Sequence, residues 1–496
     1  MENRRHFLKA LAVGSALVLG WNPLRRSWVT DAQTPDPDEP FVALPPLDGT
    51  IHTDAATLQD FAEDFGRLLF RQPMAVLSPG SINDIATIIR FARKHRLKVA
   101  MNGQAGTDDQ RESHSQFGQA QAEAGIVIDV KPLSTIHGVD DQAGVADVDA
   151  GVRWAELFDA AEAFGLAPAV MTDYLHLSIG GTLSVGGIGG HIQKHGTQAD
   201  NVLELQVVTG AGDLVTCSPL QHRRLFMAVL AGCGQVALIV RAKVRLLPAQ
   251  PNALVFNLFY DDLATYVEDQ TLLVRDGRFD SQAGQLAWRE DNTGWRYMIE
   301  VVKYFTPPHM PDADALLAGL QDDRSSMTIV PLSFREWQFR VDALAASLKG
   351  LGAWNAPHPW INLWIPGSKA VAFMGDLTAR LTPDDLGLGI ALFYPIKTRQ
   401  VSAHLFRLPA EPIAFYLGLL RFPPDDPSVI TAMLADNRRL FDEVVGYGGT
   451  RYVIGTIPDF TPQDWRRHFG PMWEFLASAK QHYDPDNVLT PGWGMF

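Results

Sequence analysis

Short apolar strands alternate with amphipathic helices in the first third of the chain, and this alternation restricts the fold more than any other feature. Residues 75–77 predict a buried strand, residues 81–92 a helix, and residues 98–101 and 125–130 two further strands. Strands separated by helices at this density are typical of α/β and α+β proteins. We therefore expect a mixed fold with a sizeable core.

Charge and cysteine content exclude several classes of protein. The 496 residues contain 42 Lys and Arg against 56 Asp and Glu, a formal net charge of −14. A nucleic-acid groove needs clustered cations facing phosphates, so this balance argues against nucleic acid as a partner. Cys217 and Cys233 are too few for a disulfide framework or a zinc cluster, and we expect both in the core. A large acidic enzyme without a metal site is the remaining expectation.

The first residues resemble an export signal. Arg4 and Arg5 precede an uncharged stretch over residues 10–24, which is shorter than the roughly 20 apolar residues that cross a bilayer. The paired arginines are similar to a twin-arginine signal. We expect residues 1–40 to be an export signal and linker, disordered over 28–45, and the mature chain to be periplasmic or secreted without a membrane span. A general secretory signal or an uncleaved anchor is the alternative.

Glycines concentrate between residues 180 and 196, where seven occur. Glycine lets the backbone approach a ligand closely, so this segment is either a cradle for a planar or anionic cofactor or an irregular loop. No Gly-x-Gly-x-x-Gly motif connects a first strand to a helix, so a Rossmann fold is not indicated. A Walker loop and a His-Glu-x-x-His motif are also missing from the sequence.

Five stretches carry a resemblance to a known family. They are Asp64-Phe65-Gly66, residues 114–119, residues 172–184, residues 358–362 and residues 483–492. In this order they resemble the cytokinin dehydrogenases, which belong to the vanillyl-alcohol-oxidase or PCMH-type FAD-linked oxidoreductases. Each motif alone is weak, but together the motifs span nearly the whole mature chain.

The resemblance implies an α+β architecture with two domains. A PCMH-type FAD-binding domain of two subdomains would cover residues 41–248. A substrate-binding (cap) domain over residues 249–454 would contain an antiparallel sheet flanked by helices, and residues 455–496 would return to the FAD domain. The proline-containing segment 248–251 supports the first boundary. We expect the active site where the two domains meet.

The resemblance also implies FAD attached covalently through His114. In the family a histidine at this position bonds to the flavin 8-methyl carbon, and a neutral imidazole is a competent nucleophile. The family's Gly-Arg-Gly-His-Ser loop is altered here, because an insertion after Gly103 brings in Asp108, Asp109 and Glu112. Such acids should repel a pyrophosphate unless they point away from it. FAD held without a covalent bond is the alternative.

Further cofactor contacts follow from the same motifs. They are Gly103, Ser113, Ser115, Gln119, Asp173, Ser178, Ser184, Ile188, Ile239 and Thr490. Each of them is also compatible with backbone packing. The family's Pro-Gly-Gln near the C-terminus is replaced by Pro491, Gly492 and Trp493. An indole cannot reproduce the paired donor and acceptor of an amide, so we expect stacking or a weaker polar contact there.

Asp173, Trp360 and Asn362 are the catalytic residues that the resemblance implies. Asp173 would accept a hydrogen bond from the substrate amine and take its proton, while the adjacent carbon gives a hydride to flavin N5. Trp360 and Asn362 are two residues apart, so on a strand they face the same side, toward the substrate. The amide would support the aspartate or bind the substrate. The alternative for Asp173 is that it caps a helix or a turn. The alternative for the other two is a strand in which Trp360 is simply buried and the amide of Asn362 is hydrogen-bonded at the edge.

The implied reaction is the oxidation of a secondary-amine C–N bond beside an unsaturated side chain. The imine formed from a cytokinin such as isopentenyladenine would hydrolyse to adenine and an aldehyde. The partners would be this small-molecule substrate and an electron acceptor, either oxygen or a quinone. A flavin oxidase of another amine or an alcohol, and a non-catalytic flavin-binding protein, are the alternatives.

Overall fold

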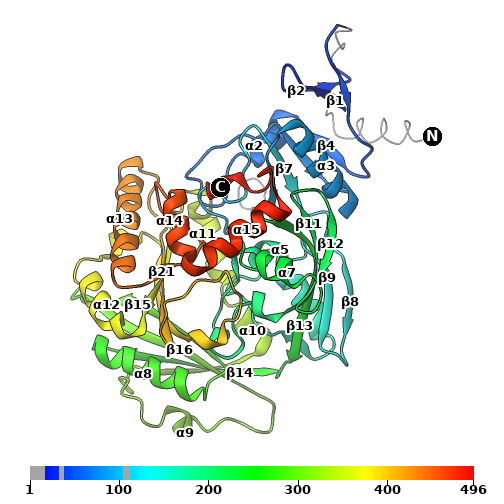
Figure 1. Ribbon diagram of the computed structural model, residues 1–496. Coiled ribbons are helices and arrows are strands. Elements are labelled where there is room, and N and C mark those ends of the chain that lie inside the picture. Colours follow the sequence, from blue (N-terminus) through cyan, green and yellow to red (C-terminus); the bar gives the residue numbers. More distant parts are fainter. Residues whose placement is uncertain (1–16, 33–37, 104–111) are drawn as a thin grey trace.

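The computed structural model describes residues 17–32, 38–103 and 112–496, which form an α+β protein with four sheets (Figure 1). Arg4 and Arg5 of the expected signal, and the inserted Asp108 and Asp109, lie outside these residues. No helix within the described ranges is long and apolar enough to cross a membrane.

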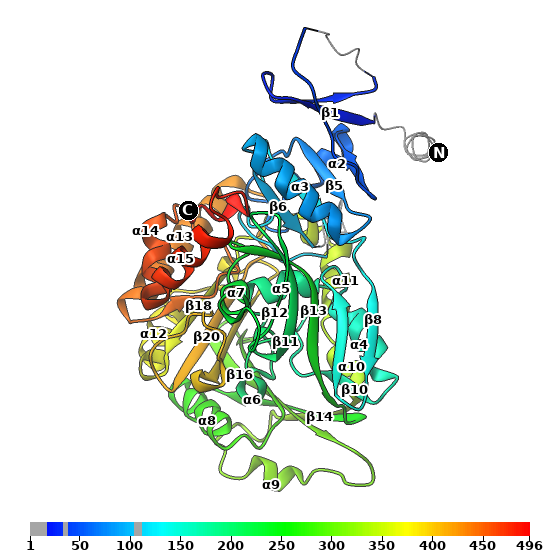
Figure 2. The same ribbon diagram turned by 45° about the vertical axis from the view of Figure 1, so that its right-hand side comes forward.

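A small N-terminal sheet projects from one end of the molecule (Figure 2). Its strands, in the order β2-β1-β3, are β1 (Val18–Asn22), β2 (Ser27–Thr30) and β3 (Val42–Ala43). Trp21 and Trp28 are buried, and Trp28 stacks on Phe91 of α3 (Ile82–His95) with ring centroids 5.8 Å apart. The prediction of a disordered linker over residues 28–45 is therefore wrong in the described part, because burial of these indoles holds the segment against the next domain.

A four-stranded sheet follows, and its predicted elements are confirmed. The strands, in the order β4-β5-β7-β6, are β4 (Thr50–His52), β5 (Ala75–Ser78), β6 (Val99–Asn102) and β7 (Ile126–Asp129). β7 pairs in parallel with both β5 and β6. Helix α2 (Ala55–Asp60) precedes β5, and α3 (Ile82–His95) connects β5 to β6. The helix buries Ile85, Ile88 and Ile89, which share one face of the helix.

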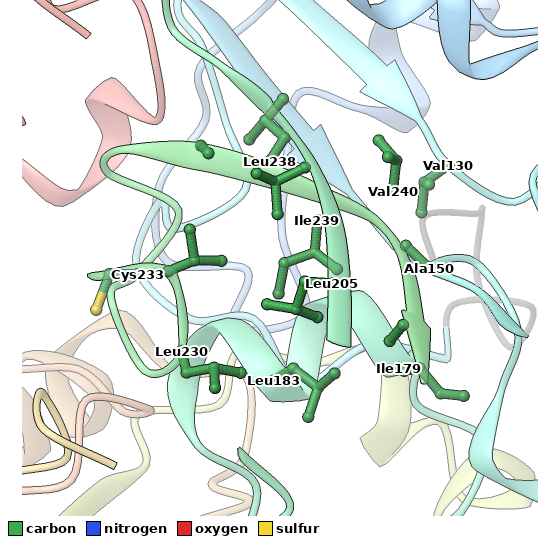
Figure 3. Close-up of a cluster of buried hydrophobic side chains, with 14 of the residues drawn as sticks. Val130, Ala150, Ile179, Leu183, Leu205, Leu230, Cys233, Leu238, Ile239 and Val240 are labelled. Carbon is green, nitrogen blue, oxygen red and sulfur yellow. The ribbon is translucent and has the colours of Figure 1, made fainter. Parts of the chain in front are cut away.

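A six-stranded antiparallel sheet follows the four-stranded sheet, and the two sheets with their helices make up the part of the chain expected to bind FAD, called here the cofactor side. Its strands are β8 (Ile136–Asp140), β9 (Val145–Asp149), β10 (Leu166–Pro168), β11 (Val202–Thr209), β12 (Leu214–Cys217) and β13 (Ala237–Pro248). The accompanying helices are α4 (Trp154–Glu162), α5 (Ile179–Val185), α6 (Ile192–His195) and α7 (Arg223–Val229). Figure 3 shows Leu183 of α5 near Leu205 of β11 and Ile239 of β13 in this core. Cys217 and Cys233 are buried and free, as predicted.

An eight-stranded antiparallel sheet occupies the opposite side of the molecule. Its order is β17-β14-β16-β15-β19-β20-β18-β21. The strands are β14 (Asn252–Tyr260), β15 (Ser281–Trp288), β16 (Trp295–Phe305), β17 (Thr328–Ser333), β18 (Ile361–Pro366), β19 (Ile390–Lys397), β20 (Ile413–Leu420) and β21 (Thr450–Arg451). The first of them begins directly after the proline-containing segment 248–251.

Helices cover one face of this sheet. The other face is directed toward the cofactor side. α8 (Leu263–Asp276), α12 (Ala370–Thr378) and α13 (Pro427–Gly446) share a buried hydrophobic cluster with strand residues such as Leu363 and Leu417. Side chains alternate across a strand, so Asn362 and Tyr416 project from the opposite face. The remaining helices of this part are α9 (Ala313–Leu317), α10 (Phe334–Gln338) and α11 (Asp342–Gly350).

The last residues return to the cofactor side through α14 (Pro462–Phe469) and α15 (Trp473–Tyr483). Leu489 forms an isolated parallel bridge with Val99 at the start of β6. In Figure 1 the C-terminus accordingly lies beside the four-stranded sheet. The end of the chain is therefore placed next to the loop that carries His114.

Candidate active site

Two adjoining cavities are lined by residues of the cofactor side, and the wider one is also lined by residues of the eight-stranded sheet. The narrow cavity has a volume of about 130 Å³ and the wide cavity one of about 460 Å³. His114, Leu177, Thr182 and Ile454 line both of them. A ligand that extends from one cavity into the other therefore passes the imidazole of His114.

The narrow cavity collects most of the residues predicted to bind the cofactor. It is lined by Gly103, Ser113, His114, Ser115, Gln119, Ser178, Ser184 and Thr490. Asp173 and Ile188 line the wide cavity instead. Ile239 lines neither, and its side chain lies in the core shown in Figure 3. Leu238 is the residue of β13 that reaches the narrow cavity, since neighbouring side chains point to opposite faces of a strand.

The lining of the narrow cavity fits an FAD molecule. A Cβ atom on Gly103 would lie 2.0 Å from Oγ of Ser178, so only glycine lets these two segments approach so closely. Ser113, Ser115, Ser178 and Ser184 line the same cavity together with Gly180 and Gly181, and segments rich in hydroxyl groups and glycine suit a chain of phosphates and sugar hydroxyls. Thr490 from the C-terminal return closes the cavity, and its hydroxyl donates to the carbonyl of Gly234 at 2.7 Å.

His114 is enclosed by aromatic rings. The ring centroids of Phe65 and Trp360 lie 5.0 Å away, and Tyr174 stacks at 5.3 Å with an interplanar angle of 18°. Burial, together with the nearby His358, lowers the pKa of His114 to about 3. The imidazole is therefore neutral at neutral pH, the form that acts as a nucleophile.

Glu112 does not face the cofactor as a free anion. Its carboxylate accepts hydrogen bonds from the hydroxyl of Tyr174 and from Nζ of Lys349, the latter at 2.7 Å. Lys349 belongs to α11, which is part of the substrate side, the name used here for the eight-stranded sheet and the helices between its strands. The expected repulsion between this acid and a pyrophosphate is thus offset by a cation from α11. The pairing was missed because Glu112 and Lys349 are 237 positions apart.

Asp173 forms an ion pair in the wall of the wide cavity. Its Oδ1 accepts a hydrogen bond from Nη2 of Arg340 at 2.7 Å. The next helix begins only at Ile179, with Ser178 at its N-cap, so Asp173 does not cap a helix. The helix-capping alternative is therefore wrong. No local pattern in the sequence connects Arg340 or the neighbouring Glu300 to Asp173, so neither residue could be predicted from it.

Trp360 and Asn362 both line the wide cavity. Trp360 directly precedes β18, and its indole lies edge-on to His114. The amide of Asn362 donates to the carbonyl of Ile454 at 2.9 Å and accepts from the hydroxyl of Tyr416. The amide therefore engages these two groups rather than Asp173.

Trp493 lines the narrow cavity, where the family has a glutamine. Its carbonyl accepts a hydrogen bond from Nε1 of Trp465 at 3.0 Å, and the two indoles pack edge to face. The indole at the cavity wall is thus held by α14. In the ranges that the structure describes, no three His, Cys, Asp or Glu side chains form a group suited to a metal ion.

Comparisons with known proteins agree with this arrangement. Residues 279–496 match the family model described as cytokinin dehydrogenase 1, FAD and cytokinin binding, and residues 73–218 match that of an FAD binding domain. The uncharacterized oxidoreductase ORF5 in the fasciation locus of Rhodococcoides fascians is 37% identical over 451 residues, covering 90% of this chain and 99% of the relative. The chain belongs to the cytokinin dehydrogenase family. It is an FAD-linked oxidoreductase that acts on the CH–NH group of donors.

Plant members show the same extended similarity. Cytokinin dehydrogenase 7 of Oryza sativa subsp. japonica is 33% identical over 497 residues, which cover 90% of this chain and 91% of the relative. Cytokinin dehydrogenase 8 of Oryza sativa subsp. indica is 35% identical over 493 residues, which cover 88% and 90%. The resemblance seen in the sequence motifs is thus confirmed along nearly the whole chain.

Proposed function

We propose that this member of the family oxidises the secondary-amine C–N bond of a cytokinin-type substrate, in which a flat heterocycle carries an unsaturated side chain on its amine. The observation that carries the proposal is the carboxylate of Asp173 in the wall of a wide, mainly apolar cavity that adjoins the cofactor cavity. Apolar walls of this cavity, such as Trp360, Leu348 and Phe422, suit a flat ring and a hydrocarbon side chain.

Asp173 acts as the base in the proposed reaction. Arg340 holds Oδ1, so Oδ2 accepts the hydrogen bond of the substrate amine and takes its proton. FAD, when bound, supplies the acceptor for the hydride that leaves the adjacent carbon. Loss of this proton and hydride converts the amine to an imine. Water then adds to the imine, which yields the heterocyclic amine and an aldehyde. An external acceptor, oxygen or a quinone, completes the cycle.

His114 anchors the cofactor in this proposal. Its neutral imidazole lies where the two cavities meet, which supports a covalent bond to the flavin. Trp360 and Tyr174 flank the imidazole and fix the plane of its ring.

The decisive experiment replaces Asp173 by asparagine, which keeps the size but removes the proton acceptor. Flavin reduction under anaerobic conditions should slow by about 10²–10⁴-fold, the range for general-base catalysis. FAD content and thermal stability should stay near wild type. Asp276→Asn serves as the control, because this carboxylate pairs with Arg278 outside both cavities.

Two results would contradict the proposal. Near-normal reduction of the Asp173→Asn variant removes the aspartate from the mechanism. Bleaching of the wild-type flavin by an alcohol or an unrelated amine, but not by isopentenyladenine, assigns the enzyme to another substrate class.

A further inference from the structure

Arg340 lies between two carboxylates in the wall of the wide cavity. Its Nη2 is 2.7 Å from Oδ1 of Asp173, and its Nε is 3.7 Å from Oε1 of Glu300. The guanidinium also packs on the ring of Trp337, with its carbon 3.8 Å from the ring centroid. Among the described residues that line the wide cavity, Arg340 is the only lysine or arginine.

These contacts join three separate elements. Arg340 lies in the short connection between α10 and α11, and Glu300 lies on β16, so both come from the substrate side. Asp173 lies in the loop before α5 on the cofactor side. The connection begins directly after Gln338, the last residue of α10. Nε2 of Gln338 donates to the hydroxyl of Tyr304 at 3.1 Å, and this hydrogen bond anchors the start of the connection. The ion pair therefore forms only where the two sides of the molecule meet.

The guanidinium remains charged in this position. Burial lowers the pKa of Arg340, but Asp173 and Glu300 raise it by more, so the pKa lies above its ordinary value. Burial raises the pKa of Glu300. A charged guanidinium forms directional hydrogen bonds to carboxylate oxygens.

An aspartate without such a partner does not keep one orientation, because rotation of its carboxylate about χ2 has a broad, roughly two-fold energy profile. Either oxygen, at a range of angles, would then meet the substrate amine. A guanidinium held by a ring and a second carboxylate removes this freedom. Orientation of a reacting group within a fraction of an ångström contributes strongly to rate.

We propose that Arg340 is a positioning residue for amine oxidation: it holds Oδ1 of Asp173 so that Oδ2 faces the substrate nitrogen. This inference rests on the proposed function of Asp173. The guanidinium acts through the carboxylate and does not bind the substrate. A residue of the substrate side thus orients the base, Asp173, which lies on the cofactor side.

A double-mutant cycle tests this role by anaerobic flavin reduction with isopentenyladenine. Arg340→Gln should lower the limiting rate of reduction by about 10²-fold, the cost of a small misplacement of a reacting group. The apparent Kd of the substrate should change little. Arg340→Lys should recover part of the rate. In an Asp173→Asn background, Arg340→Gln should have almost no further effect, because residues that act as a unit are not additive.

Arg335→Gln is a matched control for the packing of the two domains. Arg335 lies on α10 and forms ion pairs with Asp159 and Glu162 of α4, across the same domain boundary but outside the cavity. This variant should reduce its flavin at the wild-type rate. Thermal midpoint and FAD content are measured for every variant, so that loss of folding is separated from loss of rate.

Three outcomes would overturn the inference. The first is a wild-type rate of flavin reduction in the Arg340→Gln variant. The others are an undiminished loss of rate when Arg340→Gln is added to Asp173→Asn, and a loss of rate in Arg335→Gln as large as that in Arg340→Gln. A wild-type enzyme that isopentenyladenine does not reduce would instead contradict the proposed substrate. The cycle is then run with the compound that does bleach the flavin, and the same three outcomes apply.

Discussion

His114 combines an uncharged ring with a fixed ring plane. Burial and His358 keep its pKa at about 3, and stacking on Tyr174 orients the imidazole. The hydroxyl of Tyr174 is itself bound by Glu112, and Lys349 pairs with the same carboxylate. The inserted acid thus orients the histidine's neighbour, a role that residue type alone does not indicate.

Removal of the imidazole should release the cofactor. If His114 forms the bond to FAD, acid-precipitated wild-type protein retains yellow flavin in the pellet, and His114→Ala releases it to the supernatant. His195→Ala is the control, because His195 lies on α6 and lines neither cavity. A colourless wild-type pellet would show that FAD is held without a covalent bond.

At the scale of elements, the C-terminal return is held by a buried ion pair. Nζ of Lys480 donates to Oδ2 of Asp484 at 2.7 Å and to the carbonyl of Gln235 at 2.9 Å. The same carboxylate accepts from the backbone of Val488 and Leu489. These hydrogen bonds attach α15 and the segment 484–489 to the cofactor side. Thr490 and Trp493, which follow this segment, thereby reach the narrow cavity.

Loss of this ion pair should destabilise the protein and weaken FAD retention. Asp484→Ala leaves the buried ammonium of Lys480 unpaired, and removal of one partner of a buried pair costs about 3–5 kcal/mol. Asp486→Ala is the matched control, since that neighbouring carboxylate pairs with Arg93 at the exposed surface. Thermal midpoints of the two variants, with FAD content, decide the matter. Equal stability of both would contradict the structural role of Asp484.

At the scale of the whole molecule, buried neutral histidines couple folding to pH. Burial lowers the pKa of His191 to about 3 and that of His468 well below its ordinary value. In the unfolded chain both return to about 6.5, so the unfolded state binds more protons below that pH. Their contribution to stability is therefore full above pH 6.5 and decreases as the pH falls below that value, for His191 down to its pKa of about 3.

Acid should lower the thermal midpoint steadily in this range. Each histidine contributes up to about 1.4 kcal/mol per pH unit between the two pKa values. His468→Phe should flatten the dependence of the thermal midpoint on pH between 6.5 and 4. His482→Gln should leave it unchanged, because His482 is exposed. A slope that His468→Phe does not alter would contradict this assignment.

Export is a further prediction for the whole molecule, and we propose the twin-arginine route from Arg4 and Arg5 followed by residues 7–9. Replacement of Arg4 and Arg5 by lysine should leave the precursor, already carrying FAD, in the cytoplasm. Cell fractionation and flavin fluorescence measure this. Unchanged export of the variant would indicate the general secretory route.

Local patterns were sufficient for much of this protein. Hydrophobic periodicity predicts β5, α3, β6 and β7, because the buried face of each element is encoded by residues a few positions apart. The prolines before β14 mark the start of the eight-stranded sheet. Ordered motifs identify the family, and the two-residue spacing of Trp360 and Asn362 agrees with their position on one cavity, although only Asn362 lies on β18.

Only the tertiary structure determined which residues of the substrate side contact the catalytic residue of the cofactor side. Arg340 and Asp173 are 167 positions apart, and no spacing in the sequence connects them. Their contact depends on how the connection between α10 and α11 packs against the loop before α5. Long-range packing also determines that Leu238 rather than Ile239 lines the narrow cavity, and that Trp28 packs on Phe91. Periodicity specifies which face of an element is buried, whereas the identity of the facing residue depends on long-range packing.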